Sequence, residues 1–125
     1  MRKHYLLLLS ALLTTPLVIN QAMAHGNTEP VHGGVVKIVG EYSFEMKAQG
    51  DEVSVWVFYD GEPLNASDLQ LRLKVKGKGR KEVVTIPARE ANEFTGPLDL
   101  AGIEQVLAML TLEDGVSKIV GKYKL

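Results

Sequence analysis

The stretch "LQLRLKVK" (69–76) decides the fold, because apolar and polar residues alternate along it without interruption. Leu69, Leu71, Leu73 and Val75 share one face of an extended chain, and the polar residues between them share the other. A period of two is typical of a β-strand with one face in the core and one in water. The following "GKG" (77–79) predicts a tight turn that returns the chain beside this strand.

Other short segments with strand character surround this one in both directions. They are expected at 35–39, 42–48, 52–60, 81–88, 93–100, 104–113 and 116–125. By propensity alone, 104–113 is also compatible with a helix, but the "DG" at 114–115 favours a closing β-hairpin. Seven or eight strands in so short a chain predict an all-β fold, an Ig-like antiparallel β-sandwich.

Two neighbouring segments differ in the character of their second face. In "YSFEMKA" (42–48) this face carries Ser43, Glu45 and Lys47 and is expected to point to water. In "EVSVWVFYD" (52–60) Trp56 and Phe58 oppose the valines, so both faces are apolar. The second segment is therefore expected to be at least partly covered on both sides.

The first 24 residues have the order of a secretory signal peptide. A short basic start precedes "LLLLSALLTTPLVI", which is too short for a comfortable membrane span of about 20 residues. The following "AMA" (22–24) has the small residues of a cleavage site. We therefore expect a signal peptide at 1–24, a flexible N-terminal arm at 25–34 and the β-sandwich domain at 35–125. The alternative is an uncleaved N-terminal anchor.

Charge and cysteine content restrict the possible partners. Removal of 1–24 leaves 12 basic against 15 acidic residues, a net charge of −3. We therefore expect no binding to nucleic acid and no membrane contact after cleavage. The chain has no cysteine, which excludes disulfides and thiolate chemistry. The basic run "KVKGKGRK" (74–81) is interpreted as a solvated hairpin tip or, alternatively, as a contact for an acidic partner.

The sequence predicts a protein that is not an enzyme. It has no nucleophile elbow, phosphate-binding loop or dinucleotide fingerprint. After cleavage only His25 and His32 remain as histidines, so a catalytic triad would need one of them from the arm.

The arm "HGNTEPVHGG" (25–34) has the composition of a metal-binding segment. Cleavage after Ala24 makes His25 the first residue, so its α-amine and imidazole Nδ1 can chelate one ion. His32 offers a second imidazole, and Glu29 or Glu45 could add an oxygen. A set of nitrogen ligands suits copper(II), with zinc or nickel as alternatives. The alternative interpretation of "HGG" is a bend leading into the first strand.

The segment 32–67 resembles small secreted bacterial proteins, and also the N-terminal segment of periplasmic adaptor subunits of heavy-metal efflux pumps. The shared features are His32-Gly33-Gly34, Tyr42-x-Phe44-Glu45 and a valine-rich strand ending in an acidic turn at Asp60. The resemblance implies an Ig-like sandwich, a periplasmic location and a role near metal homeostasis or efflux. It adds Asp60 as a candidate ligand or supporting residue. Relatives often have a histidine after the aspartate, whereas this chain has Asp60-Gly61-Glu62.

Two functions of different classes follow from these features. The first is a small periplasmic metal-binding protein that uses His25 and His32, with Glu45 or Asp60 in support, and meets an efflux component. The second is a non-enzymatic Ig-like interaction module that binds no metal, with the loop at 60–68 or the basic hairpin as its working surface.

Overall fold

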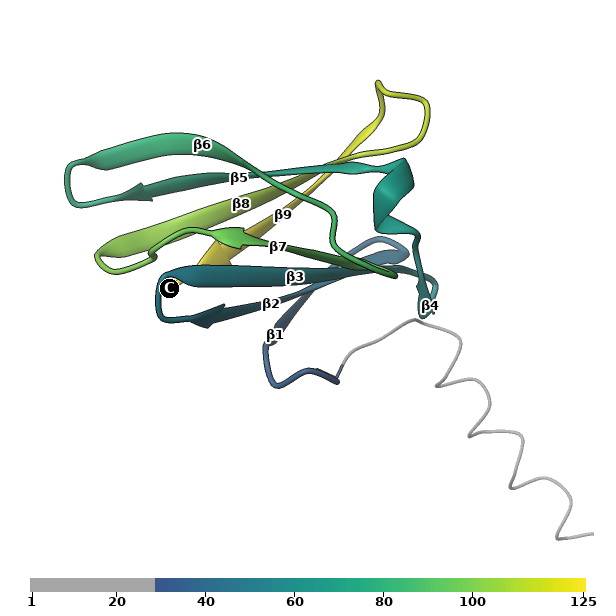
Figure 1. The fold of residues 1–125 in the computed structure, drawn as a ribbon, viewed down its shortest axis with the longest axis horizontal. Helices are drawn as coiled ribbons and strands as arrows, with labels where there is room; N and C mark the ends of the chain where they lie inside the picture. The colour runs from purple at the N-terminus through teal and green to yellow at the C-terminus, as the bar shows by residue number, and fades with distance from the viewer. Residues whose placement is uncertain (1–28) are drawn as a thin grey trace, which may run out of the picture.

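A computed structural model describes residues 29–125 of the chain, and these residues form two antiparallel β-sheets packed face to face. The expected signal peptide at 1–24 and His25 lie outside the described residues. In Figure 1 the sheet of β6, β5, β8 and β9 lies above the sheet that contains β1, β2 and β3. The predicted all-β sandwich is confirmed, and its Ig-like character stays a prediction.

The first sheet is built around β3. It contains β1 (Val35–Val39), β2 (Tyr42–Gln49), β3 (Glu52–Tyr59), β4 (Glu62–Pro63) and β7 (Glu93–Pro97). β1 pairs with β2 and β2 with β3, while both β4 and β7 pair with β3. Across β2 and β3, Glu45 lies opposite Trp56 and Ser43 opposite Phe58. This register places all four on the same face of the sheet.

The second sheet contains the segment that predicts the fold. Its strands are β5 (Gln70–Gly77), β6 (Arg80–Ile86), β8 (Ile103–Thr111) and β9 (Lys118–Lys124), in the order β6-β5-β8-β9. β8 is a strand rather than the helix that its propensity also allows, because it pairs along its length with β5 and β9. The residues described contain nine strands, and β4, with two residues, is the one not expected from the sequence.

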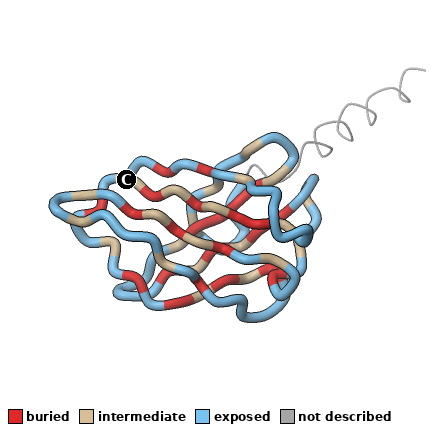
Figure 2. The backbone as a smooth tube through the Cα atoms, turned by 90° about the horizontal axis from the view of Figure 1, so that it is seen from above, coloured by how far each residue is buried: buried red, intermediate tan, exposed pale blue. Residues whose placement is uncertain are grey.

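The core lies between the sheets and is formed by the inward positions of the alternating strands. Leu71, Leu73 and Val75 are fully buried, as are Val53 and Val55 from the first sheet. Buried and exposed positions alternate along the strands (Figure 2). The predicted inward face is confirmed for Leu71, Leu73 and Val75, whereas Leu69 precedes β5 and is half-buried.

The sandwich is joined at both sides. On one side Pro87, just after β6, accepts a hydrogen bond from the amide of Thr95 in β7. On the other, β9 supplies Tyr123, whose hydroxyl lies 3.1 Å from the carbonyl oxygens of Val35 and Phe44. A 3-10 turn (Ala66–Asp68) leads into β5. Within residues 29–125, no helix is long and apolar enough to cross a membrane.

Candidate functional site

A buried carboxylate organises the outer face of the first sheet. Glu45 lies on the outward side of β2, yet only 1% of its surface is exposed. Its Oε1 accepts a hydrogen bond from the amide of Val31 (3.0 Å), and its Oε2 accepts bonds from the amides of His32 and Gly34 (both 2.8 Å). The expectation that this side chain points to water is wrong, because residues 31–34 fold over it.

The two glycines of "HGG" make this arrangement possible. Gly33 has a φ of +80°, a conformation that side chains with a Cβ rarely adopt. Gly34 lies so close to β2 that a Cβ would stand 2.5 Å from the carbonyl oxygen of Met46. Backbone amides turned inward in such a bend form a concave anion-binding site. Here the anion is the carboxylate of Glu45, so "HGG" and Glu45 form one structural unit, the Glu45 clasp.

The clasp favours the ionised form of Glu45. Burial by itself raises the pKa of a carboxyl group, since it disfavours the charge. The three backbone hydrogen bonds from Gly34, Val31 and His32, together with the nearby charge of His32, outweigh this effect and lower the pKa of Glu45. The carboxylate is therefore charged at neutral pH and holds the arm in place.

The clasp presents His32 at the surface. The imidazole lies flat on the indole of Trp56, with ring centroids 3.9 Å apart and an angle of 7° between the ring planes. His32 is exposed, while Trp56 is half-buried. Stacking uses the face of the imidazole, whereas a metal or a proton binds in the plane of the ring at Nδ1 or Nε2. The stack therefore leaves the coordination chemistry of His32 intact.

The four predicted ligands fall in different places. His25 lies outside the described residues, His32 lies on Trp56, and both Glu45 oxygens are engaged by amides. Asp60 lies in the turn after β3, with a φ of +50° and its amide bonded to the carbonyl of Glu41. It is four residues beyond Trp56, which pairs with Glu45, a separation of about 13 Å along an extended chain.

The part of the chain that the structure describes holds no group of three or more histidine, cysteine, aspartate or glutamate side chains able to bind a metal. The structure therefore brings His32 and Glu45 together through the backbone of the arm, and it leaves Asp60 apart from them. The proposed metal set depends on His25 and stays a prediction.

The sequence did not reveal the roles of Trp56 and Tyr123. The hydroxyl of Tyr123 bonds to the backbone of β1 and β2, and burial followed by the negative charge of Glu45 raises its pKa. One sequence signal for the clasp was available. Gly33 and Gly34 are adjacent, and Gly34 lies 11 residues before Glu45, a strand glutamate for which no partner was expected.

Comparison of the chain with family models found no match. Comparisons with curated proteins and with solved structures found none either. The interpretation of the site therefore rests on its residues and their geometry.

Proposed function

We propose that this is a small exported metal-binding protein, not an enzyme, that binds copper(II) through the N-terminal arm. The α-amine and Nδ1 of His25 supply two nitrogen ligands, and the imidazole of His32 supplies a third. The observation that supports this proposal is the fixed position of His32, which lies exposed on Trp56 with its ring nitrogens uninvolved in the stack. Three nitrogen donors suit copper(II) best, with zinc and nickel as weaker alternatives.

In this proposal Glu45 is a positioning residue and not a ligand. Its oxygens already accept three amide hydrogen bonds, and coordination of a metal would require breaking them. By holding the backbone of His32, the carboxylate fixes the ligand in the way that outer groups orient metal-binding histidines. Asp60 is left out of the ligand set because it lies about 13 Å along the sheet from Glu45.

The role that we propose is to buffer the metal in the periplasm, or to pass it to a component of an efflux system. In this ligand set His25 lies at the chain terminus and His32 is held on the folded domain. Such a division suits transfer of the metal, because the ligands of His25 can be replaced first by those of an acceptor. The link to efflux follows only from the features that 32–67 shares with adaptor subunits, such as His32-Gly33-Gly34.

Trp56 is the only tryptophan of the chain and reports directly on His32. Copper(II) bound to a ring stacked 3.9 Å from the indole should quench its fluorescence strongly, whereas zinc, which is diamagnetic, should compete without quenching. His32→Ala should abolish saturable quenching, and His25→Ala should weaken copper binding by at least tenfold. Asp60→Asn is the matched control and should leave the titration unchanged.

Mass spectrometry of the exported protein tests the premise that His25 is the first residue. A different start removes the chelate formed by the amine and the imidazole. Equal copper affinity in the wild type and in His25→Ala/His32→Ala would contradict the proposal and favour the alternative, an interaction module that binds no metal.

A further inference from the structure

The outer face of the second sheet is strongly cationic. The strand register places Lys81, Lys76 and Lys124 in one row across β6, β5 and β9, with Gln105 of β8 between the last two. The next row holds Lys74 and Lys122. Arg72 and Lys118 complete the set further along β5 and β9. Seven of the twelve basic residues within 29–125 therefore share one face.

No carboxylate stands in these rows, although residues 29–125 contain fifteen. Many of those fifteen lie in turns, such as Asp51, Asp60 and Asp114. The net charge of −3 therefore conceals a separation of charge. The expectation of no membrane contact rested on that average, whereas the face alone carries a charge of +7.

Aliphatic side chains lie between the cations. Val83 and Val120, on the edge strands β6 and β9, are 50% and 45% exposed. Leu107 and Met109 of β8 are half-buried, and Met109 lies opposite Val120. Val83 lies opposite Lys74, and Leu107 lies between Lys74 and Lys122. Aliphatic groups are therefore interspersed among lysines whose long aliphatic stems can reach past them.

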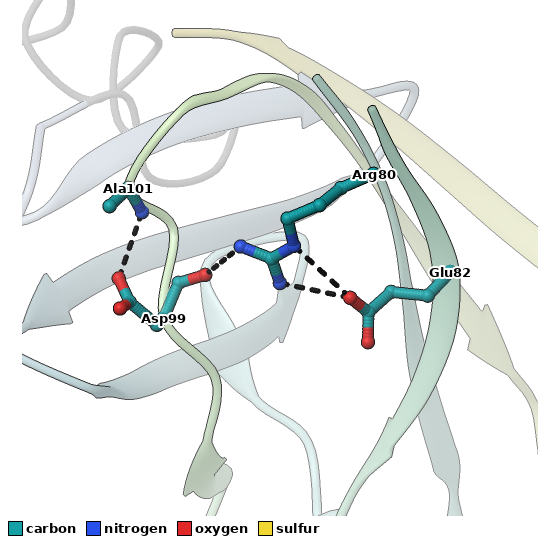
Figure 3. Close-up of polar contacts among 4 residues, drawn as sticks. All are labelled: Arg80, Glu82, Asp99 and Ala101. Carbon is teal, nitrogen blue, oxygen red and sulfur yellow. Dashed lines mark hydrogen bonds and ion pairs between the residues drawn. The ribbon is translucent and has the colours of Figure 1, made fainter. Parts of the chain in front are cut away.

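Only some of the basic residues in the run 74–81 belong to this cationic face. Arg80 does not belong to it, because its Nε and Nη2 donate to Oε2 of Glu82 and its Nη1 donates to the carbonyl of Asp99 (Figure 3). Lys76 and Lys81 have no carboxylate directly opposite them in the sheet, although Glu104, at the bulge of β8, lines a shallow pocket with both lysines. The cationic face is therefore a property of the strand register and not of the basic run 74–81.

The arrangement costs stability. Lys76 and Lys81 are directly opposite each other, and like charges in this position destabilise a strand pair. A face assembled for stability alone would pair these charges, so their accumulation points to an external anionic partner.

We propose that the outer face of β6, β5, β8 and β9 binds an anionic lipid surface. Protein interfaces are depleted of lysine and enriched in aromatic residues and arginine, whereas this face has six lysines, one arginine and no aromatic residue. The lack of aromatic side chains also disfavours single-stranded nucleic acid, which binds by base stacking. Lysines around exposed aliphatic groups suit a headgroup layer, where the amines meet phosphates and the aliphatic groups enter the acyl boundary.

Vesicle co-sedimentation tests this proposal with protein obtained by expression of the full-length sequence. Vesicles with equal parts of phosphatidylglycerol and phosphatidylcholine should bind the protein, and pure phosphatidylcholine vesicles should not. Binding should weaken steeply with added salt. Lys76→Gln/Lys81→Gln/Lys124→Gln should lower affinity roughly a hundredfold, at about fivefold for each lysine. The matched control, Lys37→Gln/Lys47→Gln/Arg89→Gln, removes the same charge elsewhere and should bind as the wild type does.

A second variant distinguishes lipid from other polyanions. Val83→Ser/Val120→Ser should weaken binding to the anionic vesicles several-fold and leave binding to polyglutamate or heparin unchanged. The proposal is overturned if the wild type binds both kinds of vesicle equally, or if the two lysine variants behave alike. It is also overturned if Val83→Ser/Val120→Ser binds vesicles like the wild type and polyglutamate binds as tightly as lipid, because the partner is then an acidic polypeptide.

Discussion

The two outer faces of this sandwich are built in opposite ways. On the first sheet a single carboxylate, Glu45, is removed from water, surrounded by amides and covered by the arm. On the second sheet six lysines and Arg72 share one face, and no carboxylate stands in their rows. On the first face the charged group is bound by backbone amides of the same chain. On the second face the charged groups remain available to an external partner.

This difference shows that charged residues can contribute either to the stability of the fold or to the binding of a partner. The clasp uses charge to fix structure, since its hydrogen bonds are strong and an unmade bond in a buried site is costly. The lysine rows contribute little to folding, since exposed charges are solvated and screened. Substitutions on the first face should therefore change stability, and substitutions on the second should change binding.

The largest effect is expected from Glu45→Gln. An amide offers one oxygen where two are used, and its NH2 group would face an arm amide that needs an acceptor. We expect the free energy of unfolding to fall by about 3 kcal/mol, measured by urea denaturation. The control Glu52→Gln, at an exposed position of β3, should stay within about 0.5 kcal/mol of the wild type. Equal losses of stability in Glu45→Gln and Glu52→Gln would show that the buried carboxylate contributes no more than an exposed one.

Acidification tests the same carboxylate without a substitution. Its pKa is lowered in the folded state, so its full contribution is present above the ordinary value of 4.5. Below 4.5 the unfolded chain takes up the proton first, and the contribution is lost as the pH passes through the lowered pKa of the folded state. The stability difference between the wild type and Glu45→Gln should therefore be constant near neutral pH and shrink below pH 4.5. If the stability difference between the wild type and Glu45→Gln grew on acidification, the ionised form of Glu45 would not be the stabilising one.

Gly34→Ala should cost about 2 kcal/mol, because the new Cβ would meet a backbone oxygen that cannot easily move. The same substitution in the Glu45→Gln background should cost much less, since the arm is already released. Thermal unfolding of the four proteins gives the coupling between the two sites. Additive effects would show that Gly34 and Glu45 act separately.

His32→Ala should lower stability by about 1 kcal/mol and shift the emission of Trp56 to longer wavelength, because the indole loses its covering ring. His32→Phe is the matched variant, which should restore the stack and the emission but not copper binding. Recovery of copper binding in His32→Phe would exclude the imidazole as a ligand.

The smallest effect is expected on the second face, and it has the opposite sign. Lys81→Glu places a carboxylate opposite Lys76 and should raise the free energy of unfolding by about 0.5 kcal/mol. The same variant should bind anionic vesicles less tightly. A gain of stability together with a loss of binding would separate the two roles of charge on one residue.

The sequence predicted those parts of the molecule in which local pattern determines burial. The alternation in 69–76 gave the strand and its inward face, and Trp56 and Phe58 indicated correctly that β3 is covered on both sides. The pattern was misleading at Glu45, because a polar residue in an outward position normally meets water. The amides that bury it belong to residues 11 to 14 positions earlier, outside the strand pattern.

The cationic face was hidden for a different reason. Its lysines come from three strands, and those of β9 (118, 122 and 124) lie 42 to 50 residues after those of β5 (74 and 76). Only the register brings Lys76 and Lys124 into one row. Net charge, which sums over all faces, cannot report such a separation.

Tyr123 has a consequence for the time course of folding. Its hydroxyl bonds to the carbonyl oxygens of Phe44 and Val35 across sequence separations of 79 and 88 residues. Contacts between distant parts of a chain form late, and β-sandwiches dominated by them fold in milliseconds to seconds. The contact between β1 and β9 spans 88 residues of the sequence, so it is expected to form late in folding. Until then the outer edge of β1 lacks the bond from Tyr123, and the polypeptide remains open along that side.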